Sequence, residues 1–270
     1  MINLKASLSI LLLTLLTVGV STADSNIGPL FGYTGGNNGP EKWGNLNPSY
    51  STCKTGKNQS PVDIVKSQVA RSRTFKSLTR IYNPCNATLI NNGFNVGIHV
   101  ESDAGVMVVD GKNYTLEQMH WHSPSEHRLN GVQYPMELHL VHKAGDGSTS
   151  VVGILYQYGS PDPFLAKIKD ELEELAKETC AENEEAHIGL GTMDLKLLQK
   201  QTRKFFRYVG SFTTPPCSEP VVWNVLARVR NVAKDQVEAL KAPLSAEYKN
   251  NSRPLQPLNG RRVELYAEVD

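Results

Sequence analysis

Three histidines of this sequence are spaced so that their side chains can meet. His120 and His122 are two residues apart, and His139 follows in Glu-Leu-His-Leu-Val-His. Residues two apart on a strand face the same side, so His120 and His122 project together while Trp121 faces the other way. Antiparallel pairing of the two segments would bring His139 within about 5 Å of them. Three imidazoles with an open fourth position are typical of catalytic zinc, and we predict Zn²⁺ as the cofactor.

A carboxylate near these histidines leaves a second interpretation open. The spacing His120-x-His122-x-x-x-Glu126 matches the first half of a cupin metal motif, in which Glu126 would itself bind manganese or iron in a secreted oxidase. The second half of that motif is missing, because no Pro-x-Gly precedes a later histidine at the expected spacing. The cupin oxidase therefore stays as an alternative. We expect structural roles for His127 and His142 and a polar surface position for the remaining two, His99 and His187.

The elements that must position these residues are mainly strands. Short β-branched and apolar runs broken by turns such as Asp110-Gly111 predict strands, namely 87–90, 96–100, 105–109, 116–122, 137–142, 150–156, 205–212 and 220–229. Helical spacing of apolar residues predicts helices at 164–177 and 233–241. Helices are too few for a regular βαβ alternation. We therefore predict a mixed α/β fold dominated by β, with residues 24–60 as an irregular segment packed through Tyr33 and Trp43.

Composition excludes several classes of function. The 270 residues include 28 basic and 27 acidic side chains and are 40% hydrophobic, which rules out a disordered chain or a coiled coil. The formal net charge of +1 gives no reason to expect nucleic acid or an anionic membrane as a partner. No internal repeat or linker divides the chain. We predict one domain over residues 24–270, whose function comes from a local site; the oligomeric state is left open.

The first 23 residues read as a secretory signal peptide. Lys5 precedes an apolar run at 8–20, and Ser21 and Ala23 provide small residues before a cut at Asp24. That run is shorter than the roughly 20 residues that span a bilayer, so we predict no membrane span. The signal predicts the secretory pathway, with the extracellular space or apoplast as destination and the vacuole or plastid as alternatives.

Cysteines and glycosylation motifs agree with a secretory route. Oxidising compartments favour disulfides, and four cysteines allow three pairings. Sequons predict glycans on Asn86, Asn113 and Asn250. The cysteines are Cys53, Cys85, Cys180 and Cys217.

The chain resembles the alpha-class carbonic anhydrases, closest to their plant, dioscorin- and nectarin-like branch. The resemblance spans nearly the whole chain after the signal and rests on collinear motifs: Asn-Gly-Pro-Glu-Lys-Trp (38–43), Gln-Ser-Pro-Val-Asp-Ile (59–64), Gln-Met-His-Trp-His-Ser-Pro-Ser-Glu-His (118–127), Glu-Leu-His-Leu-Val-His (137–142), Gly-Ser-Phe-Thr-Thr-Pro-Pro-Cys (210–217) and Arg-Pro-Leu-Gln-Pro-Leu (253–258). It implies a large, twisted, mostly antiparallel sheet with short peripheral helices.

The resemblance also implies roles for individual residues. The zinc ligands would be His120, His122 and His139. The second ring nitrogen of each would donate a hydrogen bond: His120 to Gln118, His122 to the backbone carbonyl of Asn251, and His139 to Glu137. Thr213 would donate its hydrogen to Glu126 and so orient the zinc-bound hydroxide that attacks carbon dioxide. An apolar substrate pocket would comprise Val141, Val151, Phe212, Thr214, Val221 and Trp223.

The implied activity is that of a secreted zinc lyase that interconverts carbon dioxide and bicarbonate. The rival function is a storage or binding protein on the same fold, because some plant members have lost zinc ligands and accumulate in tubers. Phe94 stands near the position where the family often has a proton-relaying histidine. A phenyl ring cannot relay protons, so we expect turnover to be limited by proton transfer and to rise with imidazole concentration.

The resemblance further implies a disulfide between Cys53 and Cys217, the family's common pair. Closing a loop of that length would contribute on the order of 3–5 kcal/mol to stability. Cys85 would then pair with Cys180 by elimination if both are oxidised, with free thiols or intermolecular pairing as the alternatives.

Overall fold

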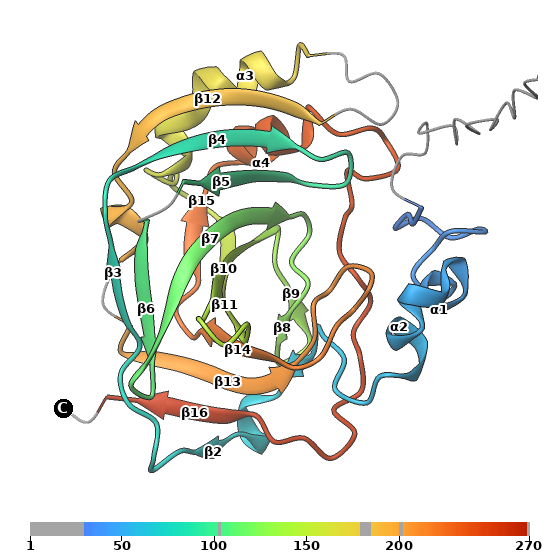
Figure 1. The fold of residues 1–270 in the computed structure, drawn as a ribbon, viewed down its shortest axis with the longest axis vertical. Helices are drawn as coiled ribbons and strands as arrows, with labels where there is room; N and C mark the ends of the chain where they lie inside the picture. Colours follow the sequence, from blue (N-terminus) through green and yellow to red (C-terminus); the bar gives the residue numbers. More distant parts are fainter. Residues whose placement is uncertain (1–29, 102–103, 179–184, 200–201, 269–270) are drawn as a thin grey trace, which may run out of the picture.

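The computed structural model describes residues 30–101, 104–178, 185–199 and 202–268. The predicted signal peptide therefore lies outside the described residues. Figure 1 shows strands curving around the middle of the molecule, with the short helices α1 and α2 at one side and α3 near β12. None of the helices in these ranges has the length and apolar character needed to cross a bilayer.

The strands are short in most of the chain and longest around the histidines. Their bounds are β1 Asp63–Ile64, β2 Ala70–Arg71, β3 Thr79–Tyr82, β4 Cys85–Asn91, β5 Val96–Val100, β6 Gly105–Val109, β7 Lys112–His122, β8 Arg128–Leu129, β9 Val132–Gln133, β10 Met136–Lys143, β11 Thr149–Tyr158, β12 Ala186–Met193, β13 Lys204–Gly210, β14 Val221–Leu226, β15 Arg230–Val232 and β16 Glu264–Ala267. The α-helices are α1 Trp43–Leu46, α2 Thr52–Thr55, α3 Lys169–Leu175 and α4 Lys234–Lys241, with 3-10 turns at Pro48–Tyr50, Lys66–Gln68, Leu165–Ile168 and Lys196–Leu198.

One large sheet holds 13 of the described strands in a mixed arrangement. Its main path runs β12-β4-β5-β7-β10-β11-β14-β13-β16-β2, with β6, β3 and β15 attached at its sides, while β1, β8 and β9 form a small second sheet. Most neighbours of the large sheet are antiparallel; β11 is parallel to β14 and β15, and β16 is parallel to β2. The expected large, mostly antiparallel sheet with short peripheral helices is therefore confirmed.

Two predicted elements differ in detail from the observed ones. The helix expected over 164–177 begins as a 3-10 turn at Leu165–Ile168 and becomes α-helical only at Lys169. Residues three apart eclipse in a 3-10 turn, which lets Leu165 and Ile168 both enter the core, where each is about 98–99% buried. The strand expected over 220–229 ends at Leu226, and the chain bends before β15.

The sheet has an apolar core on each side. The larger core contains Met119, Leu138 and Leu140 together with residues of α3 and α4, whereas the smaller one contains Trp223 and Val151. Alternate residues of β7 and β10 therefore divide between the larger core and the histidine side. This division puts His120 and His139 on the side away from Met119 and Leu138, as the period of two predicts.

The segment before β1 packs as expected through its aromatic residues. Trp43 is fully buried, donates its indole hydrogen to the carbonyl of Gly32 at 2.9 Å, and contacts Phe31 edge-on. Tyr33 packs against Trp43 with ring centroids 5.5 Å apart. The predicted packing through Tyr33 and Trp43 is confirmed, although the described part of the segment also forms the short helices α1 and α2. Phe31 links it to Phe94 near the histidines.

Candidate metal centre

Strands β7 and β10 bring the three histidines together. The antiparallel register places His139 opposite His120 and Glu137 opposite His122. His139 Nδ1 lies 3.3 Å from His120 Nε2, and one ring nitrogen of each of the three histidines lies within 4.8 Å of the others. Two ligands at about 2.0–2.1 Å from a tetrahedral zinc ion are themselves about 3.3 Å apart. The spacing of the nitrogens therefore suits that ion.

Each ring is held by an acceptor on its outer side. His120 Nδ1 donates to Gln118 Oε1 at 2.8 Å, and His122 Nδ1 donates to the carbonyl of Asn251 at 2.6 Å. His139 Nε2 donates to Glu137 Oε1 at 3.0 Å. These contacts join the pairs that the resemblance implied. An acceptor on one ring nitrogen places the proton there and leaves the other nitrogen unprotonated.

The inner nitrogens consequently point lone pairs at one another. In neutral rings with these outer hydrogen bonds, neither His120 Nε2 nor His139 Nδ1 carries a hydrogen, so their short separation is repulsive unless a cation lies between them. His122 Nε2 is buried without a hydrogen-bond partner among the described residues. Such a buried atom needs a partner. The donor set thus fits a divalent ion that binds imidazole, and zinc above all.

The electrostatics of the site favour neutral imidazoles. Burial lowers the pKa of His120 well below its ordinary value, and lowers that of His122 to about 4. Burial also lowers the pKa of His139. Neutral rings at physiological pH are the form that binds a metal.

A chain of buried hydrogen bonds supports Glu137 from behind. Its carboxylate accepts hydrogens from His127 Nδ1 at 2.7 Å and from His139 Nε2, and the backbone N–H groups of Glu126 and His127 donate to its other oxygen. Tyr208 in turn donates to His127 Nε2 at 2.7 Å. Burial alone would raise the pKa of Glu137, but the two histidines lower it well below its usual range. His127 thus has the structural role predicted for it.

His127, Glu137 and His139 form a second group of metal-binding side chains. The distances within it are 2.7 Å and 3.0 Å, which are hydrogen-bond lengths. Protons therefore already occupy the positions that an ion would need. The group around His120 is the better metal site.

Glu126 and Thr213 lie beside the cluster. Glu126 Oε2 is 3.5 Å from His122 Nε2, and Glu126 Oε1 accepts from the backbone N–H of Arg253 at 2.9 Å. Burial raises the pKa of Glu126 to about 7, although His139, Thr213 and Arg253 lower it. A divalent cation nearby would favour the ionised carboxylate further. Thr213 lies close enough to Glu126 to lower the pKa of that carboxyl, and the hydrogen bond between them that the resemblance implied stays a prediction.

A cavity of about 270 Å³ opens onto the cluster. Gln118, His120, His139 and Thr213 are in its lining. Of the predicted pocket residues, Val221 lies behind the wall in the smaller core, and the others line the cavity, namely Val141, Val151, Phe212, Thr214 and Trp223.

Several cavity residues carried no signal that we recognised in the sequence. His99, Asn92 and Asn95 line the cavity, although His99 was expected to be ordinary surface. Its position on β5 opposite Gln118 of β7 could have indicated this. Phe94 also lines the cavity. The expectation that proton transfer limits turnover stays a prediction.

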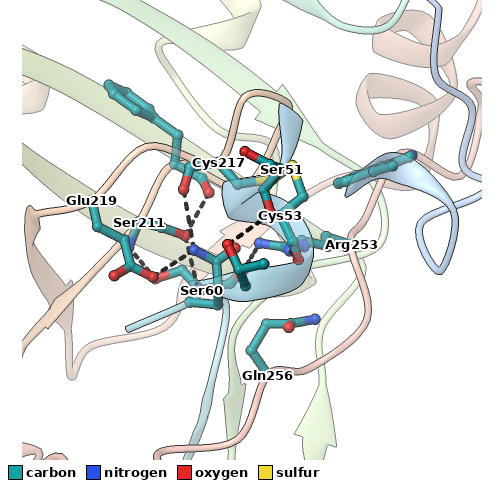
Figure 2. The surroundings of a disulfide bond; sticks show 12 residues. Ser51, Cys53, Ser60, Ser211, Cys217, Glu219, Arg253 and Gln256 are labelled. Carbon is teal, nitrogen blue, oxygen red and sulfur yellow. Dashed lines mark hydrogen bonds between the residues drawn. A yellow bond between two sulfur atoms is a disulfide. The ribbon is translucent and has the colours of Figure 1, made fainter. Parts of the chain in front are cut away.

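A disulfide between Cys53 and Cys217 ties the segment before β1 to the turn after Thr213. The S–S distance is 2.08 Å, and the backbone N–H of Cys217 donates to the carbonyl of Thr214. Figure 2 shows Ser60, Ser211, Glu219 and Arg253 around this bond. The buried Arg253 donates to the carbonyls of Cys53 and Ser60 at 3.2 Å and 2.8 Å. The disulfide is thus linked to Glu126 through Arg253. Cys180 lies outside the described residues, so its pairing with Cys85 stays a prediction.

The fold and site together define a class: β-sheet proteins with a three-histidine group beside a cavity that two of the histidines line. A model of the eukaryotic-type carbonic anhydrases matches residues 38–267. The chain belongs to this family, whose named plant members include carbonic anhydrases, lyases that act on a small-molecule substrate, and dioscorins. The expectation of a carbonic anhydrase is thereby confirmed, and the cupin alternative is not supported.

Known plant proteins and solved structures agree with this assignment. The chain is 41% identical over 231 residues to alpha carbonic anhydrase 7 of Arabidopsis thaliana, covering 86% of this chain and 82% of that protein. It is 38% identical over 238 residues to dioscorin DB3L of Dioscorea polystachya, with 87% and 86% covered. The crystal structure of dioscorin complexed with ascorbate superposes with a TM-score of 0.85 at 37% identity, covering 89% of this chain and 99% of that one.

Proposed function

We propose that this chain catalyses the reversible hydration of carbon dioxide to bicarbonate and a proton, with Zn²⁺ held by His120, His122 and His139. The observation that carries this proposal is the convergence of three histidine nitrogens next to a cavity in a member of the carbonic anhydrase family. When bound, Zn²⁺ supplies a Lewis acid that makes a nucleophile of water near neutral pH, as is established for carbonic anhydrases.

The chain's own residues orient that nucleophile. Thr213 would give its hydroxyl hydrogen to Glu126, which the Arg253 backbone holds in place. The Thr213 oxygen can then only accept a hydrogen from the attacking water, so a lone pair of that water is directed toward the substrate. Such orientation lowers the entropic part of the barrier.

The cavity wall suits an uncharged substrate. Val141, Val151 and Trp223 are 95% or more buried and line the cavity beside His139. Carbon dioxide has no net charge and accepts hydrogen bonds weakly, so an apolar surface can hold it near the nucleophile without a polar anchor. Bicarbonate is charged, and the same surface favours its release.

Removal of the metal tests the proposed function. We expect the purified protein to contain one zinc per chain by elemental analysis and to lose carbon dioxide hydration when treated with a strong chelator, with recovery on adding Zn²⁺. A sulfonamide should abolish the activity of the zinc-loaded protein. A storage or binding protein would show little hydration activity in every state, and a metal-free protein with full activity would contradict the proposal.

Replacing Thr213 by valine should lower kcat/KM for hydration on the order of 10²-fold, the usual effect of removing one positioned hydrogen-bonding group. Valine has the shape of threonine but neither accepts nor donates a hydrogen bond. Thr213→Ser keeps the hydroxyl and is the matched control, which should retain most of the activity. Stopped-flow measurements with a pH indicator would show this; equal rates for valine and serine would contradict the orienting role.

We also propose a secretory location for one domain over residues 24–270. The disulfide and the plant relatives support this route. The side chains of Asn86, Asn113 and Asn250 are exposed, which leaves room for glycans. The apoplast is the destination we favour, with the vacuole or plastid as alternatives.

A further inference from the structure

A second cavity lies away from the candidate metal centre. It has a volume of about 620 Å³ and is bounded by the segment after β11, the start of β13 and the connection from β14 to β15. On β14, Trp223 lines the metal-site cavity while Leu226 lines this one, and the two linings share no residue within the described ranges. Its size is in the range of pockets that bind small molecules.

The lining of this second cavity is strongly basic. Four basic residues are in its lining, and Asp162 is the one acidic residue among the described residues there. Asp162 Oδ1 already accepts hydrogen bonds from the backbone N–H groups of Phe164 and Leu165 at 2.9 Å and 3.0 Å. This oxygen therefore caps the following helical turn. The four cationic residues are Arg203, Lys204, Arg228 and Arg230.

These positive charges are poorly neutralised by the protein. Arg203 lies 3.8 Å from Glu268, and both of these side chains are exposed. Within the described part of the chain, no carboxylate lies within 4 Å of the charged groups of Lys204, Arg228 or Arg230. Four like charges around one cavity repel one another in a chain whose formal net charge is only +1. An anion in the cavity would relieve that repulsion.

Arg230 is held in place at the cavity wall. Strand β15 pairs with β11 so that Arg230 lies opposite Tyr156, whose side chain is buried. The pairing fixes the Arg230 backbone, and its guanidinium has five N–H donors that can serve a ligand. The planar fork of arginine matches the oxygens of a phosphate group.

The rest of the lining is apolar. The exposed side chains of Pro161 and Pro163 and the half-buried Val229 present apolar surface to it, while Phe164 and Leu226 are almost fully buried at its edge. Such a surface would bind an apolar or aromatic group but gives no reason for an inorganic ion alone. The lining therefore fits a molecule with an anionic end and an apolar end.

We propose that this second cavity binds a small organic phosphate, a monoester whose dianionic group contacts Lys204, Arg228 and Arg230 and whose apolar part packs on Pro163 and Val229. Phosphate monoesters carry a charge near −2 at neutral pH. A dianionic ligand neutralises several cationic side chains better than a ligand with a single carboxylate group does. This site is separate from the carbonic anhydrase chemistry.

Isothermal titration calorimetry with phenyl phosphate tests the proposal. At low salt we expect saturable binding of one molecule per chain, at least about tenfold tighter than inorganic phosphate because the phenyl ring is buried, and weaker as sodium chloride is raised. The double variant Lys204→Gln/Arg228→Gln should bind at least about tenfold more weakly. The control Lys177→Gln/Arg262→Gln removes the same two charges from exposed positions outside the cavity and should bind within twofold of the unaltered protein.

The same titration on zinc-loaded and chelator-treated protein separates this site from the metal centre. Equal affinity in both forms is expected, whether or not the protein hydrates carbon dioxide. Circular dichroism should show both double variants folded, since all four replaced side chains are exposed. Absence of saturable binding, full binding by Lys204→Gln/Arg228→Gln, no gain from the phenyl ring, or loss of binding on chelation would each overturn the proposal.

Discussion

Replacing His122 by alanine should abolish both zinc retention and carbon dioxide hydration. The variant leaves only two imidazoles, and loss of a direct ligand should exceed the roughly 10–100-fold loss of affinity seen when only a ligand's outer hydrogen-bond partner is removed. We expect less than about 1% of the hydration rate. Elemental analysis after dialysis and stopped-flow kinetics on the same preparation would measure the two effects together.

Two further variants make the His122 experiment interpretable. Gln118→Ala removes only the acceptor that holds His120, so its loss of zinc affinity should be intermediate. His187→Ala removes an exposed histidine outside the cavity and should change neither quantity. His122→Ala also leaves the buried carbonyl of Asn251 without its donor, which costs about 1–3 kcal/mol, so unfolding of the metal-free proteins should be compared. Full zinc content and activity in His122→Ala would contradict the assignment of the centre.

The convergence of the histidines could be predicted because it depends on a short-range rule. A period of two fixes which side of a strand each residue faces, and β7 and β10 are close neighbours in sequence. Register is harder, because β7 and β10 shift relative to each other between Val141 and His142. The shift lies beyond His139, so it does not disturb the pairing of His139 with His120.

Residues that arrive from distant segments could not be placed by local patterns. The Asn251 carbonyl reaches His122 across a sequence separation of 129 residues, and Arg253 reaches Glu126 across 127. No periodicity encodes such contacts, and the resemblance alone indicated the first of them.

Strand β12 was missed for a different reason. Ala186, Ile188 and Leu190 do alternate, but Gly189 and Gly191 weaken the strand signal, and the register shifts between these glycines.

Replacing Cys53 and Cys217 together by serine should lower the free energy of unfolding by about 3–5 kcal/mol, because the bond closes a loop with a sequence separation of 164 and restricts the unfolded chain. For a domain of this size, that loss lowers Tm by roughly 6–20 °C. Hydration activity should also be lower than that of the unaltered protein at temperatures where both are folded. The reason is that the bond anchors the Thr214–Cys217 turn and supports Arg253. Zinc content should be retained, since none of the three histidines lies on that turn.

A reductant distinguishes the stabilising effect of this disulfide from that of any second disulfide. Urea unfolding of the unaltered protein in reductant should match that of Cys53→Ser/Cys217→Ser without it, because both lack the same cross-link. If the double variant is destabilised further by reductant, a second disulfide is present, and Cys85 with Cys180 is the pair that the sequence offers. An unchanged free energy of unfolding in the double variant would show that the turn after Thr213 is held by its hydrogen bonds alone, of which the Gln59 side chain to the Cys217 carbonyl at 3.1 Å is one. The expected loss of both stability and turnover distinguishes a cross-link that also positions Thr213 from one that only restricts the unfolded state.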